Sequence, residues 1–203
     1  AGTYRLTRST AVAHQLVIQE VMRETTVLPF SFGTVANSEE EIRTLLARFR
    51  GEFLDQIAYL DGKGEYGLKA LWRDKDQPFR EILAERQDIR RLRDAVAHRP
   101  PAAAYQDRIE VGRMVQGALE AKREAETQRI MGRLKPLAAD ARVNAVLMDE
   151  MLINAAFLLV SGSEPGFEEA LRVLDREYED RVRFRLVGPS PPFNFVRMPI
   201  TLR

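Results

Sequence analysis

The end of the chain constrains the fold most, because a strand-like pattern there runs directly into a proline-rich segment. Residues 181–187 read Arg-Val-Arg-Phe-Arg-Leu-Val, and this alternation of basic and apolar side chains is typical of a half-buried β-strand. Residues 188–196 read Gly-Pro-Ser-Pro-Pro-Phe-Asn-Phe-Val. Proline fixes φ and lacks a backbone N–H, so we predict that the strand ends before this segment. Folding alone rarely requires so rigid a segment, which makes it a candidate binding feature.

Composition excludes several classes of function. Lysine and arginine total 31 against 30 aspartates and glutamates, so no global field attracts nucleic acid or an anionic membrane. The absence of cysteine excludes disulfides, thiolate nucleophiles and cysteine-based metal sites, and two histidines leave little for metal binding, so we expect no cofactor. No apolar run approaches about 18 residues, and no charged segment precedes a hydrophobic one. We therefore predict a cytoplasmic protein without a membrane span.

Hydrophobic periodicity predicts the secondary structure of the first 74 residues. Ser38 and Glu41 have the spacing of a capping box, which predicts that a helix starts there. Pro29 interrupts the apolar run around it, which indicates an edge or bulged strand. The predicted elements are a helix over 9–25, that strand over 27–35, a helix over 38–60, a turn over 61–64 and a strand over 66–72.

A charged, turn-like stretch at residues 73–78 predicts a domain boundary, which divides the chain into residues 1–74 and 75–203. Beyond it the patterns predict helices over 78–97, 103–138 and 167–179, a hairpin of strands over 143–148 and 152–160, and the final strand over 181–187. This order is typical of an α+β domain whose helices cover one face of an antiparallel sheet.

Residues suited to catalysis are scattered. His14 shares the apolar face of its helix, and His98 lies at a helix end before two prolines, where its charge suits the helix dipole. Neither histidine lies in a recognisable catalytic motif with a nucleophile. Glu65 beside Tyr66 is the least poor acid–base candidate. We predict that the protein is not an enzyme.

Two surface features leave alternatives open. Arg181, Arg183 and Arg185 share one face of the last strand and could hold RNA, although neighbouring acids could make this a solvated charged face. Phe193 and Phe195 are either pinned into the core by a closing loop or exposed as an apolar docking surface. A rigid proline segment loses little entropy on binding, which keeps the second interpretation open beside the first.

The proline-rich segment also resembles the closing motif of the gas vesicle protein GvpL/GvpF family, Gly-Pro-aromatic-Pro-Pro-aromatic-Ser-Phe. Ser190 and Asn194 depart from that motif, which usually has tryptophan and serine there. Family members also have an upstream segment with a first strand before the helix that carries His14. Further segments resemble the family in order and spacing: residues 27–35 its Leu-Pro-hydrophobic-x-Phe-Gly-Thr segment, 64–69 its Glu-aromatic-x-hydrophobic-Lys strand, and 153–160 its Asn-Ala-aromatic-Leu-Val strand.

The resemblance implies an α+β protein with two domains, an N-terminal ferredoxin-like α/β domain whose first strand is missing and a C-terminal antiparallel sheet with long helices. It implies a non-enzymatic assembly factor or minor component of gas vesicles that binds the small hydrophobic shell protein and other accessory proteins, with no nucleic acid. An RNA-binding ferredoxin-like module is the alternative. The oligomeric state stays open. The expected protein-interaction residues are Pro29, Phe30, Phe32, Pro189, Pro191, Pro192, Phe193 and Phe195.

Overall fold

A four-stranded antiparallel sheet forms the centre of the computed structural model, which describes residues 6–100 and 103–198. The strands are β1 (Lys63–Trp72), β2 (Asp140–Asn144), β3 (Met151–Val160) and β4 (Val182–Ser190), and they lie in the order β2-β3-β1-β4. Helices separate β1 from β2 and β3 from β4. This element order and strand order are those of the ferredoxin-like split βαβ topology. The predicted α+β class is confirmed.

The position of β1 differs from the prediction. We expected this strand in a first domain, but it pairs with β3 on one side and β4 on the other, with Lys63 opposite Val160 and Trp72 opposite Val182. The predicted boundary between residues 74 and 75 therefore does not divide the sheet. The charged stretch at 73–78 is a surface turn from a strand into a helix, and the strands of the sheet come from residues 63–190.

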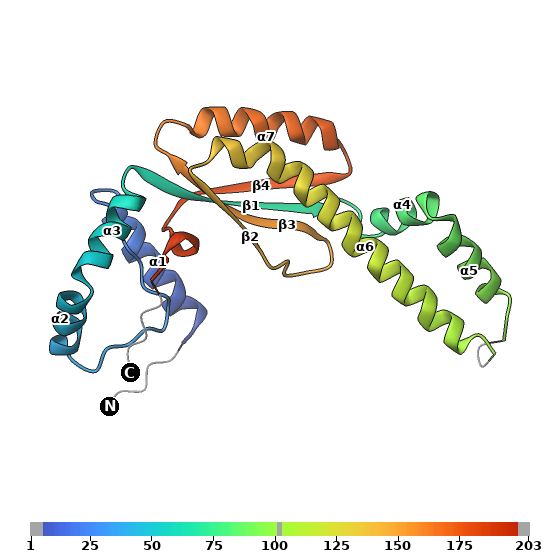
Figure 1. Cartoon of the computed structure of the whole chain (residues 1–203), viewed down its shortest axis with the longest axis horizontal. Helices are drawn as coiled ribbons and strands as arrows, with labels where there is room; N and C mark the ends of the chain where they lie inside the picture. The colour runs from blue at the N-terminus through green and yellow to red at the C-terminus, as the bar shows by residue number, and fades with distance from the viewer. Residues whose placement is uncertain (1–5, 101–102, 199–203) are drawn as a thin grey trace.

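Two helices cover one face of the sheet, the C-terminal half of α6 (Tyr105–Leu134) and α7 (Glu164–Tyr178) (Figure 1). Alternate side chains point to opposite faces of a strand, so one row of β1 faces these helices: Tyr66, Leu68, Ala70 and Trp72 are all buried. The apolar row of α7 is buried against them. This main core holds the sheet and both helices together.

Residues 6–62 form an N-terminal lobe of α1 (Arg8–Met22), α2 (Glu39–Arg48) and α3 (Arg50–Leu60), at the left of Figure 1. The Ser38 side chain caps α2 as predicted, accepting a hydrogen bond from the Glu41 N–H at 3.1 Å. The predicted helix over 38–60 breaks at Phe49, which has φ −107° and ψ 25°. Residues 27–35 are an irregular connection instead of a strand, because no neighbouring strand pairs with them. Neither α1 nor α2 buries a described residue.

A helical arm projects from the other end of the sheet. It consists of α4 (Gln77–Glu85), α5 (Gln87–Ala97) and the N-terminal half of α6 (Figure 1). The single helix predicted over 78–97 breaks at Arg86, whose φ of −106° and ψ of 89° are not helical. No helix among the described residues combines the length and apolarity that crossing a bilayer requires.

The last strand is longer than predicted. Strand β4 continues through Pro189 to Ser190. Where this end of β4 pairs with β1, the register shifts between Glu65 and Gly67. β4 lies at the edge of the sheet, and a proline is tolerated at an edge or bulge because no ladder donor is required there. After Ser190 the chain turns into the short 3₁₀ helix η2 (Phe193–Phe195); another, η1 (Lys135–Leu137), follows α6.

Candidate docking surface

Two segments that are far apart in the sequence meet at His14 on the N-terminal lobe. Its imidazole ring lies 5.6 Å from the ring of Phe32 and 6.2 Å from the ring of Phe193, measured between centroids. The two phenylalanines remain 39% and 38% exposed. We call His14, Phe32 and Phe193 the aromatic patch. Sequence analysis predicted both phenylalanines but placed His14 only on the apolar face of its helix.

The other predicted interaction residues divide into exposed and buried side chains. Phe30 is 40% exposed, beside a small cavity of about 80 Å³ that Val196 and Met198 also line. Pro189 is exposed on β4. Pro29, Pro191, Pro192 and Phe195 are buried, and of these Pro29 and Pro192 line cavities. For Pro191 and Phe195 the chain's own packing argues against direct contact with a partner.

Phe195 belongs to a second, smaller core on the sheet face opposite α6 and α7. Its fully buried ring packs in a cluster with Leu60 of α3 and with Ala156 and Leu158 of β3. The closing-loop interpretation is therefore right for Phe195, while Phe193, only two residues away, points to the surface. Because η2 turns the chain between them, the two rings have different roles.

A buried carboxylate fixes that turn. Glu65 on β1 is 6% exposed, and its carboxylate accepts hydrogen bonds from the Asn194 backbone N–H at 2.8 Å and side-chain amide at 2.6 Å. Burial raises the pKa of Glu65, and the two bonds from Asn194 oppose this only in part. Two features of the sequence pointed to this contact between Glu65 and Asn194. One is an acidic residue inside an otherwise half-buried strand, and the other is the departure from the family motif at Asn194.

Glu65 and Tyr66 do not form an acid–base pair. As neighbours on a strand they point to opposite faces of the sheet. The Tyr66 hydroxyl donates a hydrogen bond to Glu164 at 3.4 Å on the helix-covered face, whereas Glu65 contacts Asn194 on the other. This geometry argues against the catalytic role that the sequence left open.

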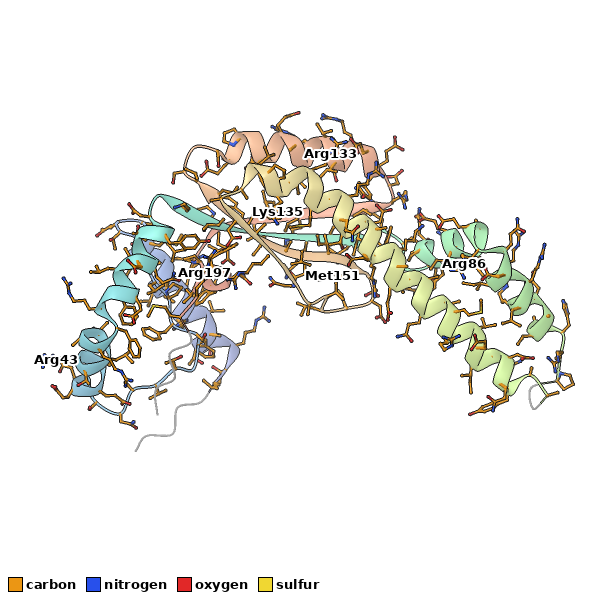
Figure 2. The ribbon with its side chains drawn as sticks, in the orientation of Figure 1. Arg43, Arg86, Arg133, Lys135, Met151 and Arg197 are labelled. Atoms are coloured by element: carbon orange, nitrogen blue, oxygen red, sulfur yellow. The ribbon has the colours of Figure 1, made fainter. Side chains whose placement is uncertain are left out.

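A polar cluster attaches the C-terminal segment to both the lobe and the sheet. The Arg197 guanidinium donates to Asp140 of β2 at 2.7 Å and to the Tyr59 hydroxyl of α3 at 2.9 Å, and it lies 4.3 Å from the centre of the Tyr59 ring. The Tyr59 hydroxyl donates to the same Asp140 oxygen at 2.8 Å. Burial would raise the pKa of Asp140, but these hydrogen bonds outweigh it and lower the pKa. Figure 2 shows Arg197 where the lobe meets the sheet.

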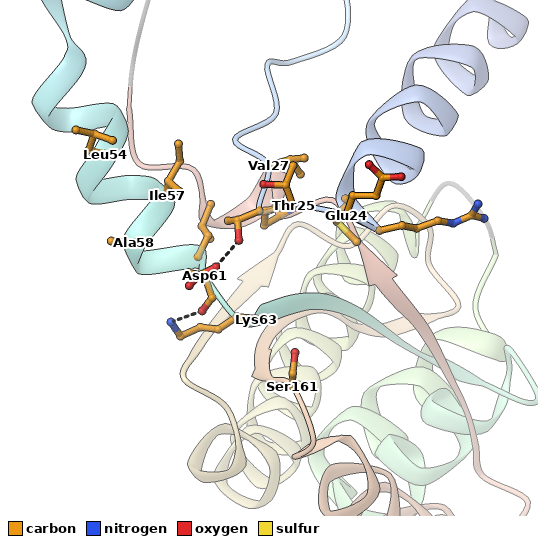
Figure 3. Close-up of a pocket in the computed structure, with 15 residues that line it drawn as sticks. Glu24, Thr25, Val27, Leu54, Ile57, Ala58, Asp61, Lys63 and Ser161 are labelled. Atoms are coloured by element: carbon orange, nitrogen blue, oxygen red, sulfur yellow. Dashed lines mark hydrogen bonds between the residues drawn. The ribbon is translucent and has the colours of Figure 1, made fainter.

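An open cavity of about 720 Å³ lies between the end of α1, the last turns of α3 and the start of β1 (Figure 3). The Thr26 hydroxyl donates to Asp61 at 2.5 Å across it, and the Lys63 ammonium donates to the backbone carbonyl of Tyr59 at 2.6 Å. Val27, Leu54 and Ile57 supply apolar walls. Within residues 6–100 and 103–198, no group of three or more His, Cys, Asp or Glu could hold a metal ion. The lining of the cavity therefore combines polar groups with apolar walls.

The three arginines at the start of the last strand separate in the structure. Arg181 precedes β4, and its guanidinium donates to Glu81 at 2.8 and 2.9 Å and to Glu126 at 3.3 Å. Burial alone would raise the pKa of Glu81, but hydrogen bonds from Arg181, Lys122 and Gln77 lower it to about 2. Arg181 thus belongs to an ion-pair cluster at the root of the helical arm, away from the exposed Arg183 and Arg185.

Comparisons with known proteins agree with this architecture. The sequence matches the family described as gas vesicle synthesis protein GvpL/GvpF over residues 1–197. Gas vesicle protein F of Nostoc sp. is 25% identical over 198 residues, which cover 96% of this chain and 80% of that protein. Gas vesicle protein L of Streptomyces sp. is 26% identical over 200 residues, covering 91% of this chain and 68% of that protein.

Solved structures give the same result for the fold. The crystal structure of gas vesicle protein GvpF from Anabaena sp. superposes with a TM-score of 0.84 at 24% identity, covering 97% of this chain and 81% of that one. The corresponding structure from Microcystis aeruginosa gives a TM-score of 0.79 at 23% identity, covering 96% and 81%. The chain belongs to the gas vesicle synthesis protein GvpL/GvpF family.

Proposed function

We propose that this protein is a non-enzymatic gas vesicle assembly factor in the cytoplasm. It binds the small hydrophobic shell protein and other accessory proteins during vesicle formation, and it either leaves afterwards or stays associated as a minor component. Membership of the GvpL/GvpF family and relatives named gas vesicle proteins F and L support the cellular role. One structural observation supports the binding role: two family-like motifs converge to expose Phe32 and Phe193 on one patch.

The size of the aromatic patch indicates how much it would contribute to the free energy of binding. Covering the exposed part of one such phenylalanine ring would contribute about 1–2 kcal/mol, from an apolar transfer energy of about 25 cal/mol per Å². The turn that carries Phe193 is already held by Glu65 and Asn194, so little ordering is required on binding. The patch is therefore suited to be a hot spot within a larger contact. Exposed apolar side chains of α1, such as Leu16 and Val17, lie on the same lobe.

A co-purification experiment tests the docking site. The protein is co-expressed with the gas vesicle shell protein, and recovery of the shell protein is compared between wild type and a Phe32→Ala, Phe193→Ala double variant. Phe79→Ala is a matched control, because Phe79 is 37% exposed on α4 of the arm. We expect the double variant to recover about tenfold less shell protein. Equal recovery by the double variant and wild type, with unchanged thermal stability, would exclude the patch as the docking site.

A further inference from the structure

In the part of the chain that the structure describes, the sheet face opposite α6 and α7 is covered at only one end. There the second core, with Leu60 and Phe195, packs on Ala156 and Leu158 of β3. Farther along β1 and β4, Lys69, Arg183 and Arg185 are exposed. They lie on this open face because they alternate with side chains that face the main core, such as Leu68, Ala70 and Val182. We call Lys69, Arg183 and Arg185 the basic face.

The sheet register concentrates this positive charge. Lys69 is directly opposite Arg185, and Leu71 is directly opposite Arg183. Like charges directly opposite each other in a sheet destabilise it. Among the described residues, no carboxylate lies within 4.0 Å of the charged group of any of these three side chains, whereas Arg181 nearby has two carboxylate partners. With almost equal numbers of acidic and basic residues in the chain, the missing counter-charge is a local property of this face.

The overall shape leaves the basic face accessible to an extended partner. In Figure 1 the N-terminal lobe and the helical arm leave opposite ends of the sheet, and both turn away from α7. The uncovered face therefore lies on the inner side of a bent molecule. Exposed Val187, next along the same row of β4, adds apolar surface beside the cations.

The side chains on this face argue against RNA as the ligand. RNA-binding sheets of this topology stack bases on aromatic side chains of their central strands. The central strands here are β1 and β3, and the residues they present to the open face include no aromatic: Glu65, Gly67, Lys69 and Leu71 from β1, and Asn154, Ala156 and Leu158 from β3. Arginine forks bind carboxylates and phosphates alike with two parallel hydrogen bonds, so the lack of stacking aromatics is the observation that favours a carboxylate ligand over RNA.

We propose that the basic face binds an acidic segment of a protein partner. Carboxylates of that segment supply the counter-charge that the described residues do not, and its aliphatic groups contact Leu71 and Val187. This surface is distinct from the aromatic patch, because it lies on β1 and β4 and shares no residue with it. The inference does not depend on shell-protein binding, since it rests only on the charge and register of the sheet.

Fluorescence anisotropy with a labelled Glu-Ala repeat peptide tests the proposal. A Gln-Ala peptide of equal length is the neutral control, and a labelled oligouridine tests the RNA alternative. Binding is measured at low and at physiological ionic strength, because exposed charge pairs are screened by salt. We expect the acidic peptide to bind, to weaken with salt, and to bind more tightly than either other probe. Failure of the acidic peptide to bind, or tighter binding of RNA, overturns the proposal.

Matched variants locate the site. The Arg183→Gln, Arg185→Gln double variant should weaken binding of the acidic peptide about tenfold. The control is Arg90→Gln with Arg91→Gln on α5, which removes the same charge from another exposed surface. Lys69→Gln removes a charge of the same face from β1 instead of β4. If one of the two test variants folds poorly, the other still tests the site. Equal weakening by the control, or no weakening by either test variant, would contradict the assignment.

Discussion

Replacing Phe195 by alanine tests the structure of the C-terminal turn most directly. The ring is fully buried against Leu60 and Leu158, so truncation loses its burial and leaves a cavity between the lobe and the sheet. Such substitutions cost about 3–5 kcal/mol. Phe193 is 38% exposed, and its truncation should cost less than about 1 kcal/mol. Two phenylalanines separated by one residue should therefore differ severalfold in their effect on stability.

Thermal unfolding followed by circular dichroism measures this difference. For a chain of this size, 1 kcal/mol shifts Tm by about 2–4 °C, so Phe195→Ala should lower Tm by about 6–20 °C. Phe195→Leu keeps much of the apolar volume and should fall between the alanine variant and wild type. If Phe193→Ala lowered Tm as much as Phe195→Ala, our account of which ring anchors the turn would be refuted.

Further predictions concern the buried polar groups and one glycine. Glu81→Gln should reduce stability at neutral pH by about 1–2 kcal/mol: the folded-state pKa of about 2 lies below the ordinary 4.5, and solvent screening at this partly exposed carboxylate reduces the contribution. That contribution is present above about pH 4.5 and lost as pH falls toward 2, so urea midpoints of variant and wild type should converge in acid. Asn194→Ala should cost about 1–2 kcal/mol in chemical unfolding and raise the pKa of Glu65 further in an NMR titration, since a buried carboxylate loses a donor. Gly188→Ala should lower Tm, because the added Cβ would lie 2.5 Å from a ring carbon of Tyr66.

Local sequence patterns predicted most elements because their signals are local. The capping serine at residue 38, the apolar row of residues 167–178 and the alternation of residues 66–72 each identify an element without its partners. The breaks at Phe49 and Arg86 were missed, since neither residue is a proline or glycine and the hydrophobic pattern continues through both. Tertiary packing decides such breaks.

The pairing of β1 could not be derived in the same way. Alternation shows that one side of a strand is buried, but it does not show which strands lie beside it. The contacts of the candidate site could not be derived from the sequence either. Motif resemblance identified Phe32 and Phe193, but only the fold shows that both contact His14 and that Phe195 points inward.

The central position of β1 also affects how the protein is made. Trp72 pairs with Val182, so roughly 100 further residues must be synthesised before both sides of β1 can be covered, a separation that slows folding. At about 5–20 residues per second, β1 would wait on the order of 10 s with at least one unpaired edge. During that interval the nascent chain exposes an apolar strand that can pair wrongly. The order of synthesis therefore gives chaperones, or a co-translational partner, a defined period in which to protect β1.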